Sequence, residues 1–295
     1  MMTKLQRRPA DSRAAGSAKN TARLERIRPM TVAVIQLSSQ GRVEDNLARA
    51  DALLREAKRA GAELVTLPEN FALMGEEDER RAIAEPLEGG PLGAFLSAAA
   101  RELKIFVVGG GMPERSADPA RPYNTSVLFG PDGKLVARYR KIHLFDVDVD
   151  GQAYRESGAT TGGDAPVVAE VRGVGLGMTV CYDVRFPELY RKLVALGARI
   201  VTVPAAFTLA TGKDHWHLLL RARAVENQVF VIAPAQQGTH PKGRQTYGKS
   251  LIVDPWGDVL AQVGEGEGFA VARLDFDYQD RVRAALPCLG HKKSI

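Results

Sequence analysis

Three residues spread along the chain have side chains suited to nucleophilic catalysis. Cys181 follows the apolar run 176–180 and precedes Pro187, where a helical pattern begins. A thiol at such a strand-to-helix junction lies near the positive end of a helix and near free backbone N–H groups. Both would stabilise a thiolate and a developing oxyanion. A lone cysteine is also often a buried structural residue, so the local context leaves both interpretations open.

A thiol nucleophile needs a base and a group that stabilises the oxyanion. None of the five histidines lies at the end of an apolar strand. Two other strand ends do offer suitable groups, because Glu69 follows the run 64–68 and Lys141 follows the run 135–140. Taken singly, a carboxylate at a strand end can be a cap, and a lysine there can be a solvated charge.

Other motifs do not lead to a different chemistry. The glycines of 173–177 precede their strand, whereas a dinucleotide fingerprint follows one. His215 and His217 are two residues apart on a predicted helix and so point to different sides. No Gly-x-Ser-x-Gly elbow is present, and two cysteines are too few for a disulfide scaffold or a Cys-based zinc site.

The elements that position these residues alternate from residue 31 onward. The predicted strands are 31–37, 63–68, 105–109, 123–129, 134–139, 176–180, 199–204, 229–234, 251–253, 259–262 and 269–274. The predicted helices are 46–59, 91–103, 187–196 and 214–228. The segments 130–133 and 254–257 have the residues of hairpin turns. This mixture predicts an α/β protein with mixed sheets.

Composition and charge divide the chain of 295 residues into two parts. Residues 1–29 hold eight Lys/Arg and two acidic residues, with few large apolar side chains, and we expect a disordered basic tail. This segment could be a solvated tail or a transit peptide, or it could result from a start site placed upstream of the real one at Met30. Residues 30–295 hold 32 basic and 33 acidic side chains, which predicts one neutral domain without a nucleic-acid-binding face. No run approaches the ~18 apolar residues of a membrane span.

Three segments together resemble the nitrilase superfamily of carbon-nitrogen hydrolases. They are 67–70, 139–145 and 180–188, which occur in the order of the family, and the resemblance covers 31–291. It implies a four-layer α-β-β-α sandwich with mixed sheets, usually paired into a homodimer. It also implies a small-molecule amide substrate and no metal or organic cofactor.

The resemblance assigns a role to each residue that matches a family motif. Glu69 corresponds to the general base, Lys141 to the stabiliser of the oxyanion and Cys181 to the nucleophile. Glu156 matches a second glutamate that positions Lys141 and the leaving group. We expect the backbone N–H of Tyr182 to complete the oxyanion site.

Within the superfamily, 206–212 and 215–223 resemble the Nit branch, and 236–240 and 244–248 are most similar to the deaminated glutathione amidases. These enzymes cleave 2-oxoglutaramyl-cysteinylglycine into 2-oxoglutarate and cysteinylglycine. Two alternatives stay open: an omega-amidase acting on 2-oxoglutaramate or another small acidic amide, and a catalytically silent scaffold. For each we expect a cytoplasmic protein that binds neither nucleic acid nor membrane.

The branch also indicates which residues bind substrate. Those that hold the 2-oxo acid match Arg185, Phe207 and Thr211. A guanidinium such as that of Arg185 can bind a carboxylate with two hydrogen bonds. Lys242 or Arg244 is a further candidate, for the distal carboxylate of a cysteinylglycine leaving group.

Overall fold

The computed structural model describes residues 27–149 and 151–293, which form two six-stranded mixed sheets and two short hairpins. In sheet order the first contains β16 (Gly268–Leu274), β1 (Met30–Gln36), β2 (Leu64–Thr66), β3 (Phe106–Glu114), β4 (Tyr123–Phe129) and β5 (Leu135–Arg140). The second contains β15 (Val259–Gln262), β14 (Leu251–Val253), β11 (Phe230–Ala233), β10 (Ala198–Thr202), β9 (Val174–Met178) and β8 (Val167–Val171). Each has three adjacent parallel strands, β1-β2-β3 and β9-β10-β11, flanked by antiparallel ones.

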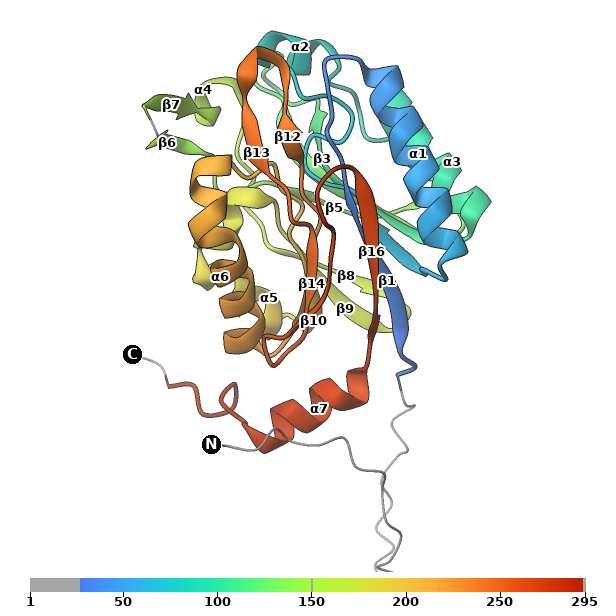
Figure 1. Cartoon of the computed structure of the whole chain (residues 1–295), viewed down its shortest axis with the longest axis vertical. Helices are drawn as coiled ribbons and strands as arrows, with labels where there is room; N and C mark the ends of the chain where they lie inside the picture. The colour runs from blue at the N-terminus through green and yellow to red at the C-terminus, as the bar shows by residue number, and fades with distance from the viewer. Residues whose placement is uncertain (1–26, 150, 294–295) are drawn as a thin grey trace, which may run out of the picture.

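Helices cover the outer face of each sheet. Figure 1 shows α1 (Val43–Arg59) and α3 (Pro91–Leu103) on one side, and α5 (Pro187–Ala195) and α6 (Leu209–Asn227) on the other. The helix α7 (Phe276–Ala285) follows β16 and lies at one end of the molecule. The layers therefore run α-β-β-α, and the predicted sandwich with mixed sheets is confirmed.

The alternation of side chains along a strand explains this layering. On β1, Val32 and Val34 belong to the core cluster that also contains the second sheet, whereas Ala33 and Ile35 belong to the cluster that contains α1 and α3. Successive residues of a strand point to opposite faces. Because both faces of β1 are apolar, the strand can only lie between two buried layers, which matches its continuous apolar sequence.

Several short elements gather at the end of the molecule opposite α7 (Figure 1). They are α2 (Glu77–Ala82), the hairpin β6 (Asp146–Val149) and β7 (Gln152–Arg155), α4 (Glu156–Ala159), and the hairpin β12 (Gln237–Thr239) and β13 (Gln245–Tyr247). Two 3₁₀ turns accompany them, η1 (Cys181–Arg185) and η2 (Pro241–Gly243). The sequence predicted none of these elements, because each is short and lacks a sustained hydrophobic period.

Most predicted elements are confirmed with small changes of boundary. The helix 91–103 and the strands 123–129, 251–253 and 259–262 have the predicted limits. The strand β8 and the helix α7 were missed. The helix α6 starts at Leu209 instead of 214. A side chain at Gly212 would stand 2.3 Å from Cβ of Tyr247, so packing against β13 requires glycine in this first turn, although glycine disfavours helices.

The predicted tail 1–29 lies almost entirely outside the described residues, so its disorder stays a prediction. The described part begins at Ile27, which packs against the core cluster of the second sheet. Among the helices that the structure describes, none combines the length and the apolar character needed to cross a bilayer.

The close approach of the two sheets at the end that carries the short elements depends on Gly110 of β3. A methyl group there would stand 2.1 Å from the carbonyl oxygen of Leu67 and 2.3 Å from Cβ of Pro204. We expect Gly110→Ala to lower the free energy of unfolding by about 1–3 kcal/mol, as overpacking does. Gly264→Ala is the control, because the space around Gly264 is open, and it should change stability by less than about 0.5 kcal/mol. Urea denaturation measures both, and equal values for the two variants would contradict this role of Gly110.

Candidate active site

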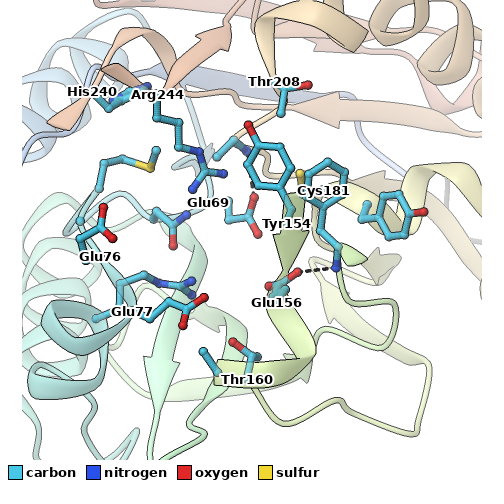
Figure 2. A pocket seen from close by; sticks show the side chains of 18 of the residues that line it. Glu69, Glu76, Glu77, Tyr154, Glu156, Thr160, Cys181, Thr208, His240 and Arg244 are labelled. Atoms are coloured by element: carbon cyan, nitrogen blue, oxygen red, sulfur yellow. Dashed lines mark hydrogen bonds between the residues drawn. The ribbon is translucent and has the colours of Figure 1, made fainter. Parts of the chain in front are cut away.

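The three residues singled out for chemistry come together in one cavity of about 300 Å³. Glu69 lies three residues after β2, Lys141 directly follows β5, and Cys181 opens η1 just beyond β9. All three line the cavity together with Glu156, the first residue of α4. Figure 2 shows Glu69, Glu156 and Cys181 facing the same space.

The Lys141 ammonium lies between two carboxylates. Its Nζ donates to Oε1 of Glu69 over 3.1 Å and to Oε2 of Glu156 over 2.8 Å, and the side chain is 2% exposed. Burial lowers the pKa of Lys141, but the charges of Glu156 and Glu69 outweigh burial and raise the pKa above its ordinary value. Lys141 is therefore a fixed positive charge.

Glu69 is buried and fully hydrogen-bonded. Its Oε1 accepts from Lys141 Nζ and, over 2.9 Å, from Nδ2 of Asn124, while its Oε2 accepts from the backbone N–H of Ala206 over 2.9 Å. Burial raises the pKa of Glu69, yet Lys141 and these hydrogen bonds together bring the pKa below its ordinary value. The carboxylate is therefore ionised at neutral pH and can accept a proton.

Cys181 is buried and has a φ of 48°, which is unusual for a residue with a side chain. Its own N–H donates to the carbonyl of Pro204 over 2.8 Å, which fixes the turn. Burial, and next the charge of Glu69, raise the pKa of Cys181 well above that of an ordinary thiol. At rest, a neutral Cys181 thiol therefore faces the Glu69 carboxylate in the same cavity.

The backbone N–H of Tyr182 directly follows Cys181, and no described residue accepts a hydrogen bond from it. An unpaired N–H beside the sulfur, with the Lys141 ammonium in the same cavity, provides two donors for an oxyanion. The arrangement can therefore transfer a thiol proton, support attack on a carbonyl carbon and stabilise the charge that develops.

A fully buried carboxylate, that of Asp183, connects the segments that carry Lys141 and Cys181. Its Oδ2 accepts from Tyr139 Oη over 2.7 Å and from the N–H of Val180 over 2.8 Å. Its Oδ1 lies 2.7 Å from Nδ1 of His143 and also accepts from the His143 N–H over 3.2 Å. Residues 139–143 and 180–183 are thereby held at a fixed separation.

The structure places the predicted substrate residues unequally. Phe207, Thr211 and Arg244 line the cavity, whereas Arg185 does not. The Arg185 guanidinium packs behind the Phe207 ring, with Cζ 5.1 Å from the ring centroid, and its Nη1 lies 3.4 Å from Nδ1 of His215. Burial lowers the pKa of Arg185, and no described carboxylate pairs with it.

Sequence reasoning missed several residues of the site. Asn124 bridges the two glutamates, since its Nδ2 donates to Glu69 over 2.9 Å and to Oε1 of Glu156 over 3.3 Å. Tyr154 and Arg80 line the cavity from the β6–β7 hairpin and from α2. Asn124 sits in a strand and Arg80 in a short charged segment, so neither carried a local signal. Asp183 lay inside a recognised motif but had no assigned role.

The part of the chain that the structure describes contains no candidate metal site. No three or more His, Cys, Asp or Glu side chains there are arranged to hold a metal ion. The carboxylates of Glu69 and Glu156 instead share the Lys141 ammonium.

The carbon-nitrogen hydrolase family matches residues 31–284 of the chain. The chain therefore belongs to this family and is a carbon-nitrogen hydrolase of the nitrilase superfamily. The deaminated glutathione amidase of Synechocystis is 45% identical over 274 residues, covering 90% of this chain and 99% of the relative. The omega-amidase NIT2 of Bos taurus is 37% identical, covering 89% of this chain and 95% of the relative.

Solved structures agree with this assignment. The crystal structure of the C. elegans NitFhit protein superposes with a TM-score of 0.84 and 36% sequence identity. The match covers 90% of this chain, which spans 65% of the NitFhit chain. The predicted family and the predicted fold are both confirmed.

The pKa shifts predict how Cys181 responds to pH. Because the pKa of Cys181 is raised, its thiolate forms only as the pH rises above the range of an ordinary thiol. Glu69→Gln removes one cause of this rise and leaves Lys141, which lowers the pKa. We expect the midpoint of alkylation by iodoacetamide to move to lower pH in Glu69→Gln. The measurement uses a Cys288→Ser background, because Cys288 is an exposed free thiol. A midpoint that stays or rises would contradict the coupling.

Proposed function

We propose that this hydrolase cleaves the amide bond of deaminated glutathione and releases 2-oxoglutarate and cysteinylglycine. The observation that carries the proposal is the buried contact of Lys141 with Glu69 and Glu156 in the cavity that holds Cys181. The 45% identity to the Synechocystis amidase supports the choice of substrate.

In the proposed first half of the reaction, Glu69 takes the proton of the Cys181 thiol while Sγ attacks the amide carbon. The oxyanion is stabilised by the Lys141 ammonium and by the N–H of Tyr182. When the intermediate collapses, the carbon–nitrogen bond breaks and Glu69 gives its proton to the departing amine. Cys181 then carries a thioester of 2-oxoglutarate.

In the second half, a water molecule gives a proton to Glu69 and attacks the thioester carbon. The same two donors stabilise the new oxyanion. Its collapse breaks the carbon–sulfur bond, and Glu69 returns the proton to the Cys181 sulfur. The free acid leaves, and the resting thiol and carboxylate are restored. We propose that Glu156 keeps Lys141 in place through both halves, since it accepts the shorter of the two hydrogen bonds.

We assign the 2-oxo acid end to the wall formed by Phe207 and Thr211. Thr211 and Thr208 both line the cavity there, and their Oγ1 atoms lie 2.8 Å apart. Arg185, directly behind Phe207, supplies positive charge and would reach a carboxylate after a change of side-chain conformation. An omega-amidase acting on 2-oxoglutaramate would use this same wall, and it is the second candidate function because of the 37% identity to the Bos taurus omega-amidase.

We also propose a homodimer in the cytoplasm. Exposed apolar side chains lie together on the outer side of α6: Leu218 and Val225 on the helix, and Trp256 in the adjoining turn. The turn contacts α6, because Arg221 Nε donates to the Gly257 carbonyl over 2.7 Å. Exposed apolar clusters of this kind are typical of protein interfaces. The two free cysteines are consistent with a reducing compartment.

Substitution of the three central residues tests the mechanism. We expect Cys181→Ala to abolish turnover, and Glu69→Gln and Lys141→Ala each to lower kcat by at least about two orders of magnitude. Steady-state assays of amide hydrolysis measure this, with thermal unfolding as the control for folding. A folded variant that keeps near-wild-type kinetics would remove its residue from the mechanism.

A comparison of two substrates tests the specificity. We expect kcat/KM to be higher for deaminated glutathione than for 2-oxoglutaramate, and Arg185→Ala to raise KM for both because they share the 2-oxo acid. Coupled detection of 2-oxoglutarate measures both reactions. A preference for 2-oxoglutaramate would select the omega-amidase, and absence of both activities would reject the two substrates.

A further inference from the structure

The cavity has four cationic side chains on the side that α2, the β6–β7 hairpin and the β12–β13 hairpin form: Arg80, Arg155, Lys242 and Arg244. Two of them are neutralised within the protein. Arg155 Nη2 donates to both carboxylate oxygens of Asp148, at 2.8 and 2.9 Å, and Lys242 Nζ lies 3.3 Å from Oε2 of Glu76. The other two, Arg80 and Arg244, form no ion pair with any described residue.

The two unpaired guanidiniums are partly withdrawn from water. In each of them Nε is inaccessible to solvent and has no hydrogen-bond partner among the described residues. A buried donor without an acceptor is costly, and more so when it belongs to a charged group. An anion in the cavity would accept hydrogen bonds from the Nη groups of both residues and would offset the charge of their partly buried guanidiniums, which bind carboxylates with short, charge-assisted hydrogen bonds.

Arg244 and Cys181 lie on different sides of the cavity. Figure 2 shows Arg244, Glu76 and Glu77 on one side of Glu69, and Cys181 with Thr208 on the other. Arg244 points into the space, and its Cζ lies 6.0 Å from the centroid of the Tyr154 ring. Thr208, whose hydroxyl lies 2.8 Å from that of Thr211 in the wall assigned to the 2-oxo acid, is thus on the other side of Glu69 from Arg244.

We propose that Arg80 and Arg244 form a second anion subsite, which binds the terminal carboxylate of the leaving group. The proposal rests on the proposed function and deepens it, because it selects amides whose leaving group is itself an acid. The two residues beyond the scissile bond span at most about 7 Å when extended, so a subsite within the same cavity can serve them.

Charge in this wall supports binding of one carboxylate. Glu77 also lines the cavity and forms no ion pair with a described residue, so the unpaired groups are two guanidiniums and one carboxylate. Their sum is one positive charge, which one bound carboxylate would neutralise. A substrate without that carboxylate, such as 2-oxoglutaramate, leaves the subsite empty.

The test compares deaminated glutathione with its C-terminal amide, which differs only in the charge of the terminal group. We expect wild-type enzyme to prefer the acid at least tenfold in kcat/KM. Arg80→Gln and Arg244→Gln should each remove most of this preference by raising KM for the acid, with a much smaller loss for the amide. The matched control is Lys242→Gln, because this cation lines the same cavity but is 71% exposed and paired with Glu76. It should retain the preference.

Failure of the subsite can be distinguished from failure of the proposed function. Three outcomes would overturn the subsite and leave the amidase function intact. They are equal turnover of acid and amide by wild-type enzyme, equal losses for both substrates in the arginine variants, and the same loss of preference in Lys242→Gln. If neither substrate is turned over, the function fails, and calorimetric binding of the acid and the amide to Cys181→Ala protein decides the subsite. Binding that is at least tenfold tighter for the acid supports it, and equal affinities overturn it.

Discussion

The buried ammonium of Lys141 is the constraint on which the rest of the site depends. A charge removed from water is tolerated only when it is paired and hydrogen-bonded, and Lys141 has two carboxylates for this purpose. Glu69 and Glu156 come from segments more than 80 residues apart in the chain. The ion pairs of Lys141 require three segments to lie close together: the ends of β2 and β5 and the start of α4. Removal of either carboxylate would leave the buried ammonium without full charge compensation.

The sandwich provides this meeting point at one end of its core, where the buried Glu69 and Lys141 share a cavity with Cys181, a member of the core cluster. Glu69 and Cys181 follow strands of different sheets, and the sheets pack with their apolar faces together over most of their length. At the end that carries the short elements, the close contact of Gly110 with Leu67 and Pro204 brings the chain after β2 near the chain after β10. The Pro204 carbonyl in turn accepts a hydrogen bond from the N–H of Cys181, so one residue connects the packing of the two sheets to the backbone of Cys181.

The sequence predicted those features that a local pattern of residues determines. Apolar runs predicted the central strands, and the motifs singled out Glu69, Lys141 and Cys181, which line one cavity in the structure. The elements that form the cavity walls were missed because tertiary contacts hold them. The β6–β7 hairpin is mostly exposed, and α2 has no buried residue. Arg80 and Asn124 could not be found from local pattern, because their importance depends on what faces them across the cavity.

The carboxylate of Asp183 has a consequence for how this sequence can change. Replacing Asp183 by an apolar residue leaves the Tyr139 hydroxyl, the His143 ring and the Val180 N–H without their acceptor at once. Replacing Tyr139 or His143 alone takes a donor from a buried charge. Each single step is therefore unfavourable, and a coordinated replacement of all three must also supply a new acceptor for the Val180 N–H. Substitutions at positions 139, 143 and 183 should therefore be epistatic. We expect these three residues to change together during evolution and not one at a time, although none of them has a proposed role in the chemistry.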